Sequence, residues 1–299
     1  MRSLYYCLFV CLLWLSISAS RAADSVRYLN EIFPRISIVK NIAYGEATAV
    51  TGGKITLFLD LYAPENDTEK SRAVILLIHG GGFYKGGKSD APMATLATRF
   101  AQRGYVTLSI NYRLMPSKGD VDTDLVRAIR IAAEDAKAAL YWVSANRLVY
   151  RMDVTRLAIG GGSAGAFTSL AVAYGPGKKE MRDIQIRAVI DIWGGLVRTG
   201  SMEQGDPPLI IIHGTGDKTV PFYFALRLNA RAKEAGIPCE FHPLPGSGHA
   251  AWENMDEYIA WIALFLDRHV IDQKVGVRTR ATPSQTIATW ADVPLKPLS

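Results

Sequence analysis

A serine flanked by glycines is the residue of this chain best suited to covalent chemistry. Ser163 lies in the sequence GGSAG at 161–165, between an apolar run at 156–160 and a helix-like run at 166–174. A Gly-x-Ser-x-Gly pattern between a strand and a helix is typical of a nucleophile elbow, whose sharp turn needs glycine where the two elements approach each other. We predict that Ser163 is a nucleophile at a helix N-terminus, which favours developing negative charge. A helix N-cap is the plainer role for the same residue.

An aspartate and a histidine later in the chain supply the partners that a serine nucleophile needs. Asp217 ends the sequence HGTGD after an apolar run, and His249 lies in GSGHA before the last strong helical pattern. A serine hydroxyl is a weak nucleophile until an adjacent base takes its proton. We predict that His249 is this base, and that Asp217 orients the imidazole and stabilises its charged form. Asp191, within the strand-like run 187–193, is the competing carboxylate.

A glycine-rich segment supplies the hydrogen-bond donors that acyl transfer requires. An apolar strand-like run ends in the sequence HGGGF at 79–83, which is typical of oxyanion loops. We predict that the backbone N–H groups of Gly81, Gly82 and Ala164 stabilise the oxyanion, where loss of one donor costs on the order of 3 kcal/mol. A phosphate-binding loop is the alternative for these glycines, but GKS at 87–89 has the wrong spacing from them.

Four aromatic residues lie next to these segments in the sequence and are candidates for a substrate pocket. They are Phe83, Tyr84, Trp193 and Trp252. Together they would form an aromatic wall for an acyl or sugar group, although each such residue more often belongs to a core. The remaining histidines, at 79, 213, 242 and 269, are expected to hold loops, pack or lie on the surface.

Alternating strand and helix patterns must position these residues. Strand patterns occur at 35–44, 55–62, 74–78, 105–111, 156–160, 187–193, 209–213 and 239–244, and helical patterns at 91–103, 122–146, 166–174, 221–235 and 253–270. This alternation predicts an α/β fold, with a mainly parallel sheet of about eight strands and helices on both faces. Ligands of such sheets bind beyond the carboxyl ends of the strands, where Ser163 and Asp217 fall. The short connections leave room for little or no cap domain.

The start of the chain indicates export. Residues 1–22 hold Arg2, an apolar stretch shorter than the roughly 20 residues of a membrane span, and the small-residue ending SRA. We predict a secretory signal peptide at 1–22, a catalytic domain at 23–271 and a C-terminal tail at 272–299. The mature protein is then secreted or periplasmic, with no stable membrane insertion. Its one remaining cysteine, Cys239, is expected to be a buried, inert thiol.

Charge argues against nucleic acid as a partner. Removal of the two arginines of the signal peptide, Arg2 and Arg21, lowers the net charge from +6 to +4. The rest of the chain has no lysine or arginine run of the kind that binds nucleic acid. The expected partner is a small-molecule or polysaccharide-linked substrate.

These motifs resemble those of secreted carboxylesterases of the α/β-hydrolase superfamily, in particular the hormone-sensitive-lipase-like and the acetylxylan and feruloyl esterase groups. HGGGF at 79–83, GGSAG at 161–165, Asp217 with VP at 220–221, and GHA at 248–250 carry the resemblance, which spans about residues 35–270. It implies hydrolysis of carboxylic esters through an acyl-serine, without a metal or organic cofactor. The missing cap favours short-chain acyl esters, or acetyl and feruloyl esters of carbohydrates, over lipids.

Two other functions are compatible with the same fold. An amide or peptide hydrolase, such as a formamidase or a prolyl-peptidase-like enzyme, would use the same three side chains. A non-catalytic binding protein would not need Ser163, Asp217 and His249 together, so their presence favours an enzyme.

Overall fold

A single sheet of eight strands organises the part of the chain that the computed structural model describes, residues 27–181 and 183–271. The predicted signal peptide at 1–22 and tail at 272–299 lie outside these residues. The strands are β1 (Ile36–Thr48), β2 (Lys54–Pro64), β3 (Arg72–Ile78), β4 (Val106–Ile110), β5 (Met152–Gly162), β6 (Ile186–Ile192), β7 (Leu209–Gly214) and β8 (Cys239–Leu244). Their order across the sheet is β1-β2-β4-β3-β5-β6-β7-β8.

The sheet is parallel except at one edge. β1 pairs antiparallel with β2, and β2 pairs antiparallel with β4, whereas every other neighbouring pair is parallel. The central strands consist mainly of buried apolar residues, and all seven residues of β3 are buried. Such runs form parallel strands because helices cover both faces of the sheet. The predicted α/β class and mainly parallel eight-stranded sheet are confirmed.

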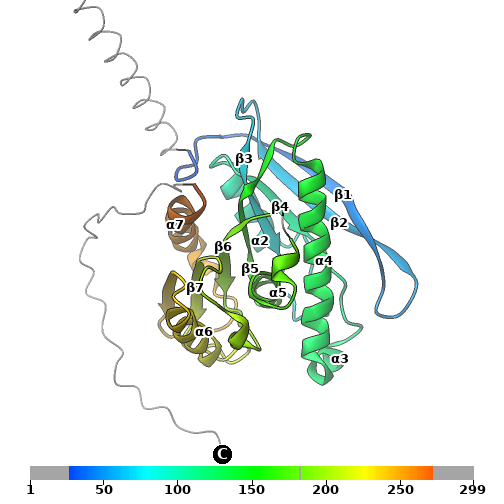
Figure 1. Cartoon of the computed structure of the whole chain (residues 1–299), viewed down its shortest axis with the longest axis vertical. Coiled ribbons are helices and arrows are strands. Elements are labelled where there is room, and N and C mark those ends of the chain that lie inside the picture. The colour runs from blue at the N-terminus through cyan, green and yellow to red at the C-terminus, as the bar shows by residue number, and fades with distance from the viewer. Residues whose placement is uncertain (1–26, 182, 272–299) are drawn as a thin grey trace, which may run out of the picture.

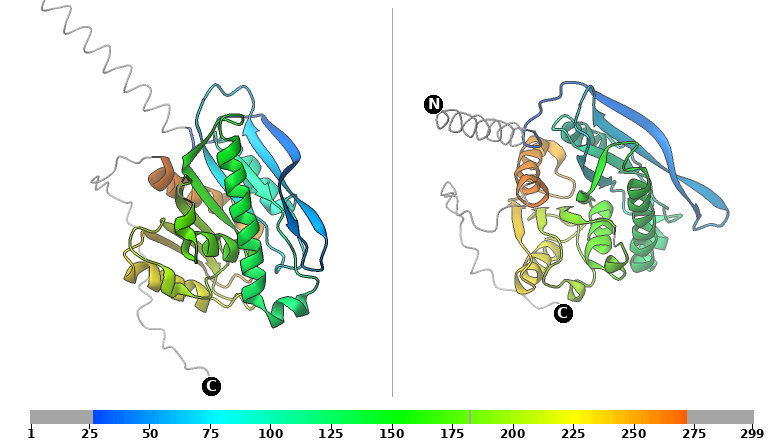
Figure 2. Two further views of the ribbon diagram at one scale, coloured as in Figure 1. Left: turned by 45° about the vertical axis from the view of Figure 1, so that its right-hand side comes forward. Right: turned by 45° about the horizontal axis from the view of Figure 1, so that its top comes forward.

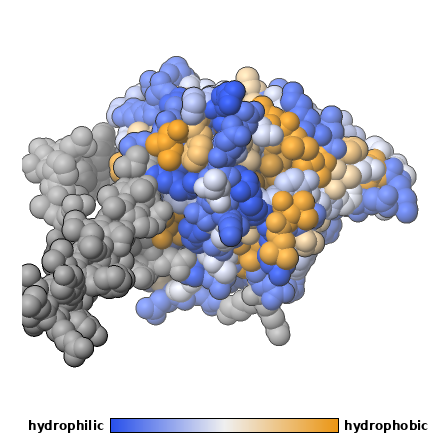
Figure 3. Space-filling model, turned by 90° about the horizontal axis from the view of Figure 1, so that it is seen from above, coloured by the Kyte–Doolittle hydropathy of each residue, from blue (hydrophilic) through white to orange (hydrophobic). Residues whose placement is uncertain are grey.

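Helices cover both faces of the sheet (Figures 1 and 2). The α-helices of the described residues are α2 (Ala91–Ala101), α3 (Lys118–Thr123), α4 (Leu125–Asn146), α5 (Ala164–Tyr174), α6 (Tyr223–Glu234) and α7 (Met255–Leu266). Apolar residues of α4, α5 and α6 form one core with the sheet, and those of α2 and α7 form a second core on its other face. The surface in Figure 3 is by contrast largely hydrophilic, with separate hydrophobic patches.

The helix predicted at 122–146 is divided in the structure. α3 ends at Thr123, and α4 begins at Leu125 with Asp124 as its N-cap, at φ −145° and ψ 72°. The Asp124 carboxylate accepts the N–H of Arg127 at 2.8 Å. An aspartate offers the backbone this alternative to a continuous helix, so the break follows from local side-chain chemistry that helical periodicity does not register.

Cys239 departs from its expected environment. It begins β8, the edge strand of the sheet, and is half-buried rather than buried. Burial nevertheless raises the pKa of its thiol to about 12, so the reactive thiolate is scarce at neutral pH. None of the helices in residues 27–181 and 183–271 is both long and apolar enough to cross a membrane.

The turn from β5 into α5 depends on close backbone contact with the end of β3. A Cβ atom on Gly161 would lie 2.1 Å from the carbonyl oxygen of Ile78, and one on Gly165 would lie 1.9 Å from the same oxygen. Ser163, between these glycines, has φ 55° and ψ −118°. This is a strained conformation that a non-glycine residue keeps only where the surrounding structure enforces it.

One carboxylate lies inside the sheet without a charged partner among the described residues. Asp191 on β6 is fully buried; its Oδ1 accepts the N–H of Gly194 at 2.9 Å, and its Oδ2 has no hydrogen-bond partner. Burial disfavours the charged form and raises the pKa of Asp191 to about 7.

Gly165→Ala is expected to destabilise the protein although alanine is the better helix former. The added Cβ must displace the Ile78 carbonyl, and overpacking of this severity costs about 3 kcal/mol or more. Thermal unfolding followed by circular dichroism should show a melting temperature lowered by roughly 6–12 °C. The matched control is Gly200→Ala, where a Cβ meets nothing within 4 Å and no change is expected. Equal melting temperatures for the two variants would contradict the close-contact account.

Asp191→Asn is expected to change how stability depends on pH. The folded state holds a proton on Asp191 up to about pH 7, whereas the unfolded state releases it near pH 3.8. Stability from this group is therefore present below pH 3.8 and falls as the pH rises to about 7. Urea unfolding of both proteins should show the variant gaining stability relative to the wild type over this range, with a constant difference above it. A difference that does not vary with pH would refute the assignment.

Candidate active site

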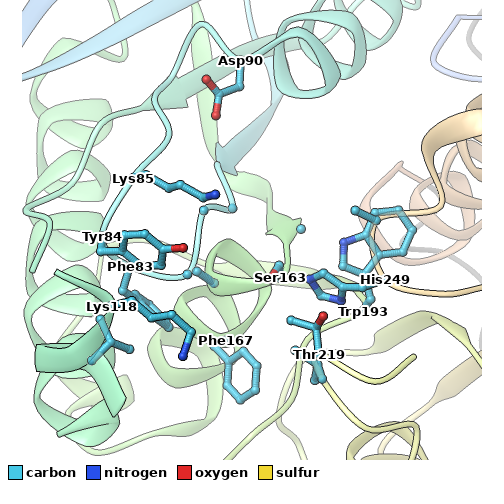
Figure 4. A pocket seen from close by; sticks show the side chains of 18 of the residues that line it. Phe83, Tyr84, Lys85, Asp90, Lys118, Ser163, Phe167, Trp193, Thr219 and His249 are labelled. Atoms are coloured by element: carbon cyan, nitrogen blue, oxygen red, sulfur yellow. Dashed lines mark hydrogen bonds between the residues drawn. The ribbon is translucent and has the colours of Figure 1, made fainter. Parts of the chain in front are cut away.

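Three loops at the carboxyl ends of the strands bring Ser163, His249 and Asp217 together. Figure 4 shows the side chains of Ser163 and His249 next to each other in the cleft. Ser163 occupies the turn between β5 and α5, Asp217 follows β7, and His249 follows β8. The Ser163 hydroxyl lies 2.9 Å from His249 Nε2, and His249 Nδ1 lies 2.7 Å from Asp217 Oδ2. With a proton on Nδ1, the imidazole donates to the carboxylate and accepts from the hydroxyl. This is the arrangement that allows a base to take the proton of a serine.

The Asp217 carboxylate is held in place by its own loop. Its Oδ1 accepts the N–H groups of Thr219 at 2.8 Å and Val220 at 2.9 Å, which leaves Oδ2 for the imidazole. His213 Nε2 lies 2.9 Å from the Val220 carbonyl and 3.3 Å from Asp217 Oδ2. Because burial lowers the pKa of His213, its ring is neutral and fixes the loop rather than adding a charge.

Asp191, the competing carboxylate, lies elsewhere. Its Oδ1 contacts the backbone of Gly194. His249 Nδ1 is instead bonded to Asp217. The two aspartates differ by position along their strands: Asp191 lies within β6, whereas Asp217 lies beyond the end of β7. The Asp191 carboxylate reaches the start of the loop after β6, at Gly194, whereas the Asp217 carboxylate reaches His249.

The predicted oxyanion donors line the same cleft as Ser163. Gly81 and Gly82 turn with φ 102° and 63°, and the Gly81 carbonyl accepts the N–H groups of Tyr84 and Lys85. Among the described residues, neither the Gly81 nor the Gly82 N–H makes a backbone hydrogen bond outside helices and strands. The N–H of the first residue of α5, at position 164, has no partner within its helix.

A buried ion pair anchors the loop that carries these glycines. The Lys88 ammonium lies 2.7 Å from Asp60 Oδ1, Ser89 Oγ donates to Asp60 Oδ2 at 3.2 Å, and both charged side chains are buried. The Lys88 N–H also donates to Asn111 Oδ1 at 2.7 Å. The GKS sequence at 87–89 therefore serves the fold, since its ammonium is already paired. Sequence reasoning missed this pair; the available signal was Asp60 alone in the apolar strand run FLDLY, where a charge needs a buried partner.

A cleft of about 620 Å³ opens above Ser163 and His249. All four aromatic residues proposed from the sequence line it: Phe83, Tyr84, Trp193 and Trp252. The two tryptophans pack edge to face with ring centroids 4.5 Å apart. Sequence reasoning did not assign the following further residues to the lining of the cleft: Lys85, Met93, Lys118, Val121, Leu125, Phe167, Thr219, Val220 and Phe224.

Backbone strain is concentrated around the cleft. Phe83, Ser163, Trp193 and Ala250 line it, and each has a positive φ, of 66°, 55°, 42° and 60° respectively. Such conformations are unfavourable for residues with a side chain and persist where packing and hydrogen bonds enforce them. They aim these side chains, with His249 beside Ala250, toward a common space.

Two family models match the chain in succession. Residues 59–197 match the BD-FAE family, and residues 198–272 match the prolyl oligopeptidase family. The first match includes the glycine-rich loop and Ser163, and the second includes Asp217 and His249. Together they cover the sheet from β2 to β8.

Several known proteins are similar to parts of the chain. The chlorogenic acid esterase of Aspergillus niger is 31% identical over 140 residues, which are 44% of this chain and 27% of that protein. A probable carboxylic ester hydrolase of Mycobacterium tuberculosis is 25% identical over 257 residues, or 70% of this chain and 55% of that protein. The chain thus spans about half the length, or less, of these curated relatives.

Solved structures share the fold. Native esterase 2 of the planctomycete Thermogutta terrifontis superposes with a TM-score of 0.63 at 23% identity, covering 82% of this chain and 96% of that chain. The order of Ser163, Asp217 and His249 along the chain is the order in which α/β-hydrolases carry these residue types. The chain has the α/β-hydrolase fold, and parts of it are similar in sequence to carboxylesterases.

Proposed function

We propose that the protein is a serine carboxylesterase that forms an acyl-serine intermediate on Ser163. The observation that carries the proposal is the continuous set of hydrogen bonds from Ser163 Oγ through His249 to Asp217 Oδ2, at 2.9 and 2.7 Å, at the floor of an aromatic-lined cleft. A binding protein on the same fold would have no need of this aligned set. The sequence similarity to proteins named as esterases supports the same conclusion.

The reaction follows from the geometry in two steps. Ser163 Oγ attacks the ester carbonyl carbon while His249 Nε2 takes its proton, and Asp217 stabilises the imidazolium. The carbonyl oxygen gains the negative charge and accepts hydrogen bonds from the N–H groups of Gly81, Gly82 and Ala164. As the intermediate collapses, the C–O bond to the alcohol breaks and His249 returns the proton to the alcohol. Water then attacks the acyl-serine by the same route, releasing the acid and restoring the hydroxyl.

The substrates we propose are short-chain acyl esters and acetyl or feruloyl esters of carbohydrates. The aromatic side chains of Phe83, Tyr84, Trp193 and Trp252 offer flat apolar surfaces on which a sugar or phenolic ring packs well. The similarity to a chlorogenic acid esterase supports an ester of this kind. A signal peptide at 1–22 would deliver the enzyme to the periplasm or the exterior, where polysaccharide-linked esters are found.

Amide or peptide hydrolysis is the second candidate. The match of residues 198–272 to the prolyl oligopeptidase family favours it, because that segment includes Asp217 and His249. The same residues would serve an amide, with the amine as the leaving group that His249 protonates.

Ser163→Ala is expected to abolish ester hydrolysis, with a loss of about 10⁴-fold or more in kcat, because no other group can form the acyl intermediate. The measurement is release of p-nitrophenol from acetate and butyrate esters, with methyl ferulate, acetylated xylan and a proline p-nitroanilide in parallel. Ser71→Ala, at an exposed serine beside the start of β3, is the matched control and should retain full activity. Ester activity that survives Ser163→Ala would contradict the proposal, and activity on the anilide alone would favour the amidase.

Asp217→Asn is expected to lower kcat about 10³- to 10⁴-fold with little effect on KM, because the imidazole loses its orienting carboxylate. Asp191→Asn is the comparison, since it makes the same chemical change at a buried aspartate that does not contact His249. Its kcat should stay within a few fold of the wild type. The measurement is kcat for p-nitrophenyl acetate at steady state. A large loss of kcat in Asp191→Asn, with kcat of Asp217→Asn near that of the wild type, would assign the orienting carboxylate to Asp191.

A further inference from the structure

A second cavity lies directly behind the catalytic cleft. It has a volume of about 430 Å³ and lies between α4, α5 and the segment 195–201 that follows β6. Its apolar lining residues are Val126, Ile129, Ala133, Phe167, Ala171, Leu196 and Val197. Charged side chains of α4, among them Arg130 and Glu134, also border it. Phe167 lines both this cavity and the cleft that contains Ser163.

Phe167 and Phe224 form the partition between the two spaces. The Phe167 N–H donates to the Ser163 carbonyl at 3.0 Å, so the ring lies one helical turn beyond the proposed nucleophile. Its ring packs edge to face against Phe224, with centroids 5.8 Å apart. Phe224 lines the cleft, and on its other side it packs against Gly195 of the second cavity, where a Cβ would lie 2.7 Å from the Phe224 ring.

The partition faces the acyl part of an ester substrate. Because His249 must protonate the departing alcohol, the alcohol part lies on the His249 side of Ser163. The acyl part then extends away from His249, and Figure 4 shows the Phe167 ring below Ser163 and apart from His249. A short acyl chain fits in front of this ring, whereas a longer chain meets it.

We propose that the Phe167–Phe224 pair is the end wall of the acyl site and sets the longest linear acyl chain that the enzyme accepts. The cavity behind the wall is open to solvent on its outer side and would extend the acyl site, and the apolar part of its lining suits the methylene groups of a saturated chain. The inference rests on the proposed esterase function and adds the residue that fixes chain length. Phe167 is a specificity-determining residue here, with no part in proton transfer.

The test compares p-nitrophenyl butyrate with p-nitrophenyl octanoate. Phe167→Ala joins the two cavities, and each methylene that then leaves water favours octanoate by about fourfold. The ratio of kcat/KM for octanoate to that for butyrate should therefore rise at least tenfold above the wild-type ratio. Adding Ala171→Leu to Phe167→Ala refills the second cavity and should return the ratio toward the wild-type value. This reversal separates passage into the cavity from a general loosening of the site.

Two further variants keep the result interpretable. Phe167→Leu preserves most of the packing and should raise the ratio by a smaller factor, so it decides the question if Phe167→Ala does not fold. Phe241→Ala removes a ring that stacks on Phe222 and lines neither cavity, and it should leave the ratio unchanged.

The outcomes separate the two proposals. Folded Phe167 variants with the wild-type ratio, or a raised ratio that Ala171→Leu does not reverse, would overturn the end-wall assignment while leaving the esterase function intact. A wild-type protein that hydrolyses neither of these esters, nor p-nitrophenyl acetate, methyl ferulate or acetylated xylan, would instead overturn the proposed function itself.

Discussion

The contact between the end of β3 and the start of α5 is the constraint on which the site depends. The Ile78 carbonyl oxygen would lie 2.1 Å from a Cβ on Gly161 and 1.9 Å from a Cβ on Gly165, so no side chain fits at either position. Ile78 is also the last residue before the HGGGF loop, so this contact fixes the position of the proposed nucleophile relative to the proposed oxyanion donors. Gly80 continues the contact, since a Cβ there would lie 3.1 Å from the Gly162 carbonyl and 3.5 Å from Ser163 Cβ. Backbone contacts therefore fix the relative positions of Ser163 and the glycine-rich loop, and the Asp60–Lys88 ion pair anchors that loop.

The acid–base half is built by a second backbone contact, between the loops after β7 and β8. The N–H of Gly216 donates to the Ser247 carbonyl at 2.9 Å, and the N–H of Gly246 donates to Thr215 Oγ1 at 2.9 Å. These contacts hold the loops that carry Asp217 and His249 against each other. Trp193, which contacts both the His249 ring and Trp252, fills the space between these loops and the elbow. The hydrogen bond between Ser163 and His249 joins the two halves at the point where the chemistry is expected.

Much of this arrangement could be predicted because it depends on local sequence. Glycines that permit a tight turn, and the residues that follow apolar strands, mark Ser163, Asp217 and His249 without knowledge of the fold. The Asp60–Lys88 pair could not be predicted, because its members lie 28 residues apart and pair only once β2 and the loop before α2 meet. The Phe167–Phe224 pair could not be predicted for the same reason. From the sequence, an apolar residue on α5 is expected to belong to the core, and only its packing against α6 places it between the two cavities.

The most direct test of the central claim is to identify the atom that becomes covalently modified. The native protein would be treated with paraoxon, which transfers a diethylphosphoryl group to an activated serine with release of p-nitrophenolate, and then digested and analysed by mass spectrometry. The account predicts one modified site, Ser163, with loss of activity in proportion to labelling. Labelling at a different residue, or an inactivated enzyme with Ser163 unmodified, would contradict it.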